Sequence, residues 1–272
     1  MPAASLAYDP GVIVSDSRDL VARWAPIAAR TVYFGHQSVG NDVLAGVRSW
    51  NEELALGVRV IQTRDPATVA GPALVHFLAG QNGDFASKNA ALLRFLDGRS
   101  GADNPIVLLK YCYVDVHSGS DVRTQFDEYL DTAATIAVDH PDAILLHTTI
   151  PITSTVEGPM KARAKRLLGR NTLRAAAVVR HRYNTLVRAE FSGREPLFDI
   201  ALAESTRPDG RRDGFVEAGE DIETLTPEYT SDGGHLNGFG RRAVAVSFLN
   251  ALAEVASGSP SLRPSLEGVE TR

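Results

Sequence analysis

Strand-like apolar runs alternate with amphipathic, helix-like stretches along most of this 272-residue chain. Residues 105–113 are apolar apart from Lys110 and the polar edges of two tyrosines, a pattern typical of a strand covered on both faces. Residues 84–96 instead repeat apolar side chains at helical spacing, which predicts a helix with one buried face. Because strands that alternate with helices form parallel sheets with helices on both faces, the chain is predicted to have an α/β fold.

The predicted elements can be assigned to residue ranges. The strands are predicted at 31–34, 57–63, 105–113, 143–150 and 196–200. The helices are predicted at 15–30, 39–50, 84–96, 120–138, 160–191 and 240–255. The charged segment 206–228 is predicted to be irregular. These elements make one three-layer α/β/α domain over residues 1–256, followed by a disordered tail over residues 257–272.

Composition and charge exclude several classes of function. A net charge of −5 argues against a general nucleic-acid binder. The longest apolar stretches fall short of the roughly 20 residues that a membrane helix needs, so no membrane partner is expected. No signal peptide is recognised before Asp9, so the cytoplasm is the expected location. Cys112 is the only cysteine, which leaves no disulfide within the chain and favours a buried apolar role for this side chain.

Two short motifs contain the groups of a serine-hydrolase triad. Ser38 follows the first predicted strand, at a strand-to-helix turn where unpaired N–H groups can stabilise an oxyanion. Near the C-terminus, Asp232 precedes His235 by three residues in a glycine-containing turn, where the carboxylate can orient one ring nitrogen. Taken singly, Ser38 could be only a helix N-cap and the Asp-Gly-Gly-His stretch only a turn. Their joint occurrence favours a triad of Ser38, His235 and Asp232.

The order of these motifs resembles that of the SGNH (GDSL) hydrolases. Asp232-Gly-Gly-His235 is similar to the late Asp-x-x-His block of that family, whereas Gln37 stands where the early Gly-Asp-Ser block has Asp. The resemblance implies a flavodoxin-like, five-stranded, mainly parallel sheet of order 2-1-3-4-5. It places the site at the carboxyl ends of the strands, near the switch point beside the first strand. The chemistry needs no metal or cofactor, and none is expected.

The resemblance also implies three oxyanion donors: the Ser38 N–H, a glycine N–H in a second block and an asparagine side chain after the third strand. The Gly-Gln-Asn-Gly-Asp stretch before the third predicted helix resembles the glycine block, with Gly83 as the better match. After the third strand only Asp115 matches, because the family's asparagine is absent. Asn82 is therefore the predicted substitute donor. Asn41 is a weaker candidate, because it lies one turn into the helix after Ser38.

Other polar residues near these motifs have alternative interpretations. His36 is assigned to substrate binding and could be a second base, although a histidine two residues before a strand-end serine more often packs or hydrogen-bonds locally. Asp115 is assigned to substrate binding and could instead be structural. Lys110 is expected at a strand end, in an ion pair with Asp115 or Asp84 or in contact with substrate. Ten basic side chains against one acid at 160–194 could form a solvated helix face or an anion-binding patch.

Together these features predict a serine esterase or deacylase. Its substrate is expected to be an ester of a small molecule or a glycan, with Ser38 as nucleophile, His235 as general base and Asp232 as the group that orients the imidazole. One alternative is an acyltransferase, in which an alcohol replaces water in the second step. The other is a non-catalytic ligand-binding module, suggested by the absent asparagine and the altered block around Ser38.

Overall fold

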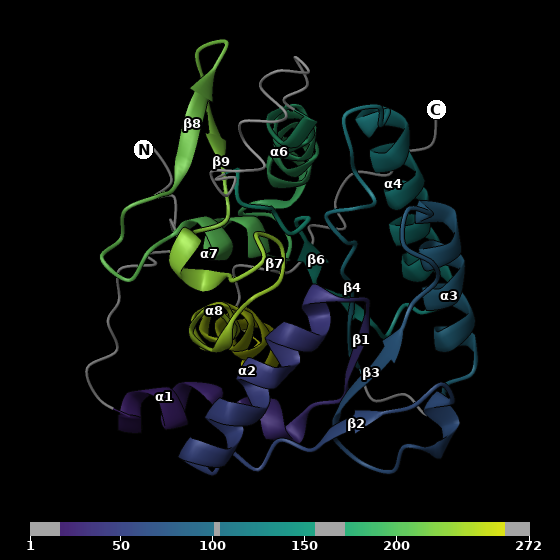
Figure 1. The fold of residues 1–272 in the computed structure, drawn as a ribbon. Coiled ribbons are helices and arrows are strands. Elements are labelled where there is room, and N and C mark those ends of the chain that lie inside the picture. Colours follow the sequence, from purple (N-terminus) through teal and green to yellow (C-terminus); the bar gives the residue numbers. More distant parts are fainter. Residues whose placement is uncertain (1–16, 101–103, 156–171, 259–272) are drawn as a thin grey trace, which may run out of the picture.

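The computed structural model describes residues 17–100, 104–155 and 172–258 (Figure 1). Nearly all of the predicted tail at 257–272, and the first part of the helix predicted at 160–191, lie outside these residues. No helix in the described ranges is both long and apolar enough to cross a bilayer. The same ranges contain no cluster of three or more metal-binding side chains.

Five parallel strands form the central sheet in the order β2-β3-β1-β4-β5 (Figure 1). They are β1 (Val32–His36), β2 (Val60–Gln62), β3 (Leu74–Leu78), β4 (Ile106–Leu109) and β5 (Ile144–Leu145). Just after β5 the chain forms β6 (His147–Thr148), which pairs in parallel with β7 (Leu197–Phe198). The expected α/β fold with a five-stranded parallel sheet is confirmed.

Strand β3 was not among the predicted strands. It inserts between the first and second predicted strands, pairing with β1 on one side and with β2 on the other. The predicted strands themselves follow one another in the order 2-1-3-4-5, with β3 as the addition. The sequence did not reveal β3 because its five residues carry a central histidine, His76, so that the apolar run on either side is too short to be distinctive.

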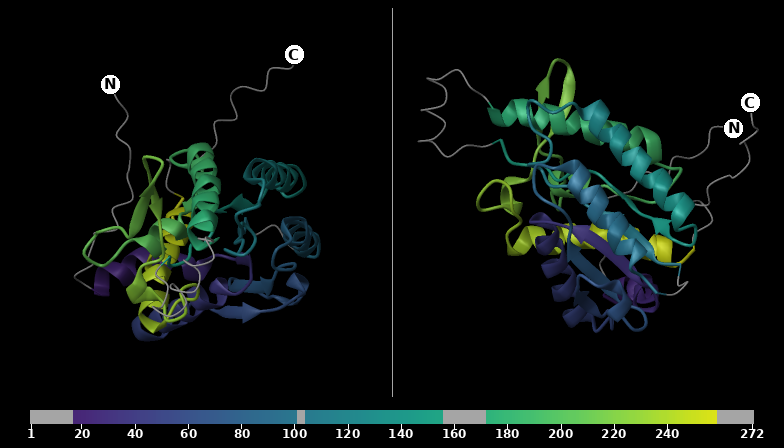
Figure 2. Two further views of the ribbon diagram at one scale, coloured as in Figure 1. Left: turned by 45° about the horizontal axis from the view of Figure 1, so that its top comes forward. Right: turned by 90° about the vertical axis from the view of Figure 1, so that its right-hand side faces the viewer.

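Helices cover both faces of the sheet (Figure 2). One face packs against α1 (Ser17–Trp24), α2 (Val39–Leu54) and α8 (Gly238–Ala256), and the other against α3 (Phe85–Asp97), α4 (Val122–Asp139) and α6 (Thr172–Phe191). Successive residues of a strand point to opposite faces, so Phe34 lies in the first core and Tyr33 in the second. A short helix, α7 (Ile200–Ser205), and 3-10 turns at Ala25–Ala29, Pro66–Thr68 and Pro227–Tyr229 complete the fold.

Helices α2 and α8 approach each other unusually closely. A Cβ atom at Gly46 of α2 would lie 2.0 Å from the carbonyl oxygen of Arg241 in α8, so only glycine allows this contact. Helix α2 begins directly after Ser38, and α8 begins shortly after His235. The close packing of these helices therefore brings together two motifs from opposite ends of the chain.

The segment predicted to be irregular contains an antiparallel hairpin. Strands β8 (Gly214–Glu217) and β9 (Glu220–Glu223) rise from the body of the molecule beside α6 (Figure 1). Ala218 and Gly219 form the two-residue turn with φ values of 52° and 85°, as a type I′ hairpin requires. The prediction was wrong here because four of the eight strand residues are acidic and only Ile222 among them is buried, so the segment lacks a strand-like apolar pattern.

Candidate active site

Ser38 occupies a strained turn between β1 and α2. Its φ and ψ are 47° and −107°, a conformation that residues with a side chain rarely adopt. Such strain persists only where the surroundings enforce it, and it is concentrated at functional sites. Ser38 is also the N-cap of α2, yet its side chain makes no capping hydrogen bond. The hydroxyl is therefore available for another partner.

That partner is His235. The Ser38 Oγ lies 2.6 Å from His235 Nε2, and His235 Nδ1 lies 2.7 Å from Asp232 Oδ2. The structure thus brings the three predicted triad residues into one continuous hydrogen-bonded chain. In this arrangement the ring nitrogen facing Ser38 can accept a proton while the other donates to the carboxylate.

The turn that carries His235 also fixes the charge of Asp232. Its Oδ1 accepts hydrogen bonds from the backbone N–H groups of His235, at 2.7 Å, and Gly234, at 2.9 Å. These donors, followed by the His235 side chain, hold the pKa of the Asp232 carboxyl well below its usual range. Asp232 therefore stays ionised at neutral and mildly acidic pH and can orient the imidazole.

Asp42 anchors this turn to α2 and was not predicted. Its carboxylate accepts the backbone N–H of Leu236 at 3.2 Å and the Arg241 Nε at 2.9 Å. Asp42 is buried, and it lies one helical turn after Ser38. It thus joins the element that carries the serine to the loop that carries the histidine. An acid in the first turn of a helix is common, so the sequence contained no distinctive sign of this role.

Tyr113 lies beside His235 and was also missed. The centroids of the two rings are 6.0 Å apart in an edge-to-face arrangement, and a Cβ atom at Gly234 would lie 2.9 Å from the Tyr113 hydroxyl oxygen. Burial, followed by the charge of Asp232, raises the pKa of Tyr113. Tyr113 belongs to the segment after β4 where the family resemblance predicts an asparagine, so the sequence indicated the segment but not the residue.

Lys110 lies directly beneath the Ser38 turn. It is fully buried at the end of β4, and its Nζ donates to the Gln37 carbonyl at 2.8 Å and to the Cys112 Sγ at 3.4 Å. Burial lowers the pKa of this amine. The expected ion pair of Lys110 with Asp115 or Asp84 is wrong. The Asp115 carboxylate instead forms an ion pair with a different lysine, which belongs to α3.

That lysine is Lys88, whose Nζ lies 2.5 Å from Asp115 Oδ2 with both side chains fully buried. Asp115 also accepts the backbone N–H groups of Gly83 and Cys112, each at 2.6 Å. Asp115 is therefore structural, and its assignment to substrate binding is corrected. Because the Gly83 N–H donates to Asp115, it is not available as an oxyanion donor. Lys88 Nζ also donates to Asn82 Oδ1 at 3.1 Å, which orients the Asn82 amide.

Gly80, rather than Gly83, lies level with Ser38. Strands β1 and β3 pair in parallel with His36 opposite Leu78, and Ser38 and Gly80 each follow two residues later. The Gln37 side chain bridges the two segments by donating to the Gly80 carbonyl at 2.9 Å. No described residue accepts a hydrogen bond from the Gly80 N–H. Gly80 has a φ of 55°, and a Cβ atom there would lie 2.5 Å from the Lys88 backbone nitrogen, so this position requires glycine.

His36 points into the protein interior. It is fully buried, and its Nε2 lies 3.1 Å from His76 Nδ1, while Arg48 contacts the far nitrogen of His76 at 3.1 Å. Burial lowers the pKa of His36 to about 2 and that of His76 to about 4, assisted by nearby cations. His36 is therefore a neutral, local packing residue. Its assignment to substrate binding is corrected, because its ring lies beneath Gly40 with no access to solvent.

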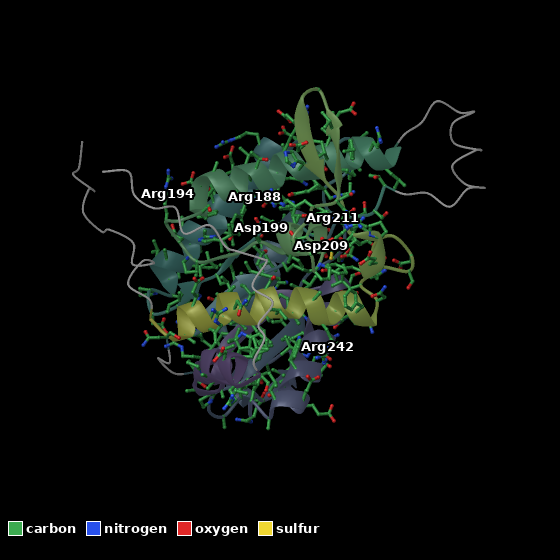
Figure 3. All side chains as sticks on the ribbon, turned by 90° about the vertical axis from the view of Figure 1, so that its left-hand side faces the viewer. Arg188, Arg194, Asp199, Asp209, Arg211 and Arg242 are labelled. Carbon is green, nitrogen blue, oxygen red and sulfur yellow. The ribbon has the colours of Figure 1, made fainter. Side chains whose placement is uncertain are left out.

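The described part of the basic stretch is built partly into the interior. Arg188 of α6 pairs with Asp199 and with Glu223 of β9, and Figure 3 shows it near Asp199, with Arg194 in the turn after the helix. Arg180 is buried and donates to the Tyr113 carbonyl at 3.1 Å. These contacts make α6 more than a solvated basic face. The first part of the stretch lies outside the described residues.

Comparisons with known proteins do not assign a family. No family model matches the chain, and no curated protein matches it. Among solved structures, a candidate platelet activating factor from Streptococcus pneumonia is similar, with 15% sequence identity and a TM-score of 0.46. The match covers 88% of this chain and 94% of that chain. A likeness at this level does not bear on activity.

Proposed function

We propose that this protein is a serine hydrolase of the SGNH type that cleaves ester bonds. The observation that carries the proposal is the hydrogen-bonded chain from Ser38 Oγ through the His235 ring to Asp232, with links of 2.6 and 2.7 Å. The strained backbone of Ser38, whose hydroxyl does not cap its own helix, supports the same interpretation.

The reaction follows from this geometry. Ser38 Oγ attacks the ester carbonyl carbon while His235 Nε2 accepts the hydroxyl proton. The tetrahedral intermediate then collapses, the bond to the alcohol oxygen breaks, and His235 returns the proton to the departing alcohol. Water attacks the resulting acyl-serine with His235 again as base, which releases the acid and restores Ser38. Asp232 remains ionised throughout and stabilises the imidazolium.

The backbone N–H groups of Ser38 and Gly80 are the oxyanion donors in this proposal. In support of this, Ser38 and Gly80 each follow the carboxyl end of a paired strand, the Gln37 side chain joins the two segments, and neither N–H donates to a described residue. Asn82 is the third donor. Because its carbonyl oxygen accepts from Lys88, its amide nitrogen is left to face a ligand. Such preorganised donors stabilise negative charge that develops on the carbonyl oxygen.

Hydrolysis is favoured over acyl transfer by the openness of the described site. The side chains of His235 and Asp232 are 45% and 57% exposed. The described residues therefore leave the His235 ring open to water. A transferase instead benefits from excluding water from its acyl-enzyme. Product analysis with and without an added alcohol separates the two: a hydrolase releases free acid at the same rate in both cases.

A fluorophosphonate probe tests the proposal directly. The wild-type protein should be labelled on Ser38, and Ser38→Ala should not be labelled. Ser231→Ala is the matched control, because Ser231 is an exposed serine in the loop that carries Asp232. It should be labelled like the wild type. Absence of labelling in folded wild-type protein, together with no turnover of phenyl acetate, would favour the ligand-binding module.

A further inference from the structure

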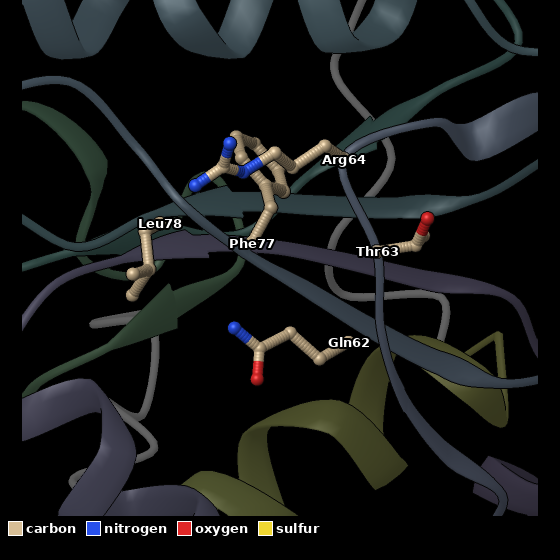
Figure 4. A pocket seen from close by; sticks show the side chains of 5 residues that line it. All are labelled: Gln62, Thr63, Arg64, Phe77 and Leu78. Atoms are coloured by element: carbon tan, nitrogen blue, oxygen red, sulfur yellow. The ribbon is translucent and has the colours of Figure 1, made fainter.

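A pocket lies at the carboxyl edge of the sheet, on the side of β2 and β3 (Figure 4). Its volume is about 330 Å³, and it is lined by Gln62, Thr63, Arg64, Phe77 and Leu78. Carboxyl edges of parallel strands are where ligands bind in open α/β sheets. None of the side chains discussed for the triad belongs to this pocket, so it is a separate surface feature of the same edge.

Strand register places the pocket next to Ser38. Leu78 lies opposite His36, two residues before Ser38, and β2 is the next strand beyond β3. Neighbouring strands are about 4.8 Å apart, so β2 lies roughly 10 Å from β1. A substrate whose ester carbonyl is at Ser38 can therefore extend one end over β3 into the pocket.

Arg64 gives the pocket an unneutralised positive charge. Its guanidinium makes no hydrogen bond or ion pair with a described residue, and the other four lining side chains are uncharged. Figure 4 shows Arg64 extending from its loop toward the side of Leu78. Arg188, by contrast, is neutralised by the carboxylate of Asp199. The Gln62 amide likewise has no described partner, which leaves further hydrogen-bonding capacity at the pocket.

The loop that carries Arg64 is held in place. The Thr63 hydroxyl accepts the Asp65 N–H at 3.1 Å, and the Asp65 side chain accepts the Ala67 N–H at 3.0 Å. The nearest acid in the sequence, Asp65, is thus used to cap the following turn and does not pair with Arg64. A cation on a fixed loop, without a counter-ion, is suited to bind an anionic oxygen group through two parallel N–H donors.

We propose that this pocket binds an anionic group of the substrate, a carboxylate or a phosphate, while the ester carbonyl lies at Ser38. This proposal rests on the proposed function. Leu78, which is 45% exposed, and Phe77 supply an apolar wall beside the charge. The substrate class is therefore an ester that carries an acidic group on the portion that extends away from the scissile bond, over β3.

Three acetate esters with the same reacting group test the specificity: neutral phenyl acetate, 4-acetoxybenzoate and 4-acetoxyphenyl phosphate. The ratio of kcat/KM for an anionic ester to that for phenyl acetate should fall about tenfold in Arg64→Gln, the effect of one exposed charge-assisted contact. Arg64→Lys should retain part of the preference. Added salt should reduce the preference in the wild type, because the contact is exposed. Whichever of the two anionic esters has the higher kcat/KM in the wild type shows whether the pocket prefers a carboxylate or a phosphate.

Arg94→Gln is the matched control, since Arg94 is an exposed arginine far along α3. Its ratio should equal that of the wild type. A ratio in Arg64→Gln equal to that in Arg94→Gln would overturn the proposal.

A binding measurement separates this result from failure of the proposed function. Phenyl phosphate and benzoate are titrated by calorimetry into Ser38→Ala and into Ser38→Ala combined with Arg64→Gln. Weaker binding in the double variant supports the pocket even if no ester is hydrolysed. If Ser38→Ala and the double variant bind each probe equally well, the proposed role of the pocket is overturned, whatever the esterase assays show.

Discussion

The Ser38 hydroxyl lies 2.6 Å from His235 Nε2, although 197 positions separate the two residues in the chain. The contact depends on the close crossing of α2 and α8 and on Asp42, which joins α2 to the backbone after His235. If Ser38 were only a helix N-cap and Asp232-Gly-Gly-His235 only a turn, nothing would require these two segments to be held in contact. The geometry is therefore the firmest basis for experiments on catalysis.

Removing either end of this hydrogen bond should abolish esterase activity. Ser38→Ala and His235→Ala should each lower kcat/KM for phenyl acetate on the order of a thousandfold or more, since the residues act as a unit. Asp232→Asn should be impaired less, because it loses orientation of the ring but keeps the base. Steady-state assays on folded variants provide the measurement. Rates within tenfold of wild type for Ser38→Ala would rule out this nucleophile.

Asp42 should act as a positioning residue. In Asp42→Ala the Leu236 N–H and Arg241 lose their acceptor, so the loop that carries His235 is less well placed. The value of kcat should fall on the order of tenfold with little change in KM. Asp42→Asn keeps an oxygen for the Leu236 N–H and should recover part of the loss. Equal kcat in both variants and in wild type would show that the loop holds its position without Asp42.

Asn82 should contribute to the oxyanion site. Asn82→Ala should lower kcat by about a hundredfold with KM nearly unchanged, because the contact strengthens only as charge develops. Lys88 orients the amide through its carbonyl, so Asn82→Asp, which lacks the donor but keeps an oxygen for Lys88, is the informative comparison. It should be as impaired as Asn82→Ala. Unchanged kcat in the alanine variant would leave the N–H groups of Ser38 and Gly80 as the whole site.

Glu204 should make stability depend on pH. It is fully buried, and burial raises its pKa from 4.5 to about 8. Between these values the folded protein holds a proton that the unfolded chain has lost, so the free energy of unfolding should fall as pH rises from 4.5 to 8. Glu204→Gln keeps an acceptor for the Ile152 N–H and cannot ionise.

The stability of Glu204→Gln relative to wild type should therefore increase by roughly 2–4 kcal/mol between pH 5 and pH 8. Urea unfolding at several pH values measures this difference, and groups common to both proteins cancel. Parallel stability curves for the two proteins would show that the buried carboxyl does not hold its proton in this range.

Sequence patterns determined the features that depend on nearby residues. Alternating apolar and amphipathic stretches predicted the parallel α/β sheet, because each strand and helix must bury its own apolar face. The contact of Asp232 with His235 also follows from sequence, since three residues in a glycine-containing turn bring the carboxylate to the ring. A lysine within an apolar strand, as at Lys110, is unusual from sequence alone, but its partners cannot be derived from the neighbouring residues.

Only the tertiary structure decided which distant segments meet. It placed the short strand β3 beside β1, and this pairing sets Gly80, rather than Gly83, level with Ser38. In the folded protein Asp115 forms an ion pair with Lys88 and not with Lys110, and the His36 ring points inward and contacts His76. Each outcome depends on register and helix packing between segments far apart in the chain. The local sequence cannot predict these contacts, because several side chains of similar chemistry could pair with each residue. Only the packing of strands and helices in the folded protein determines which of them come within reach.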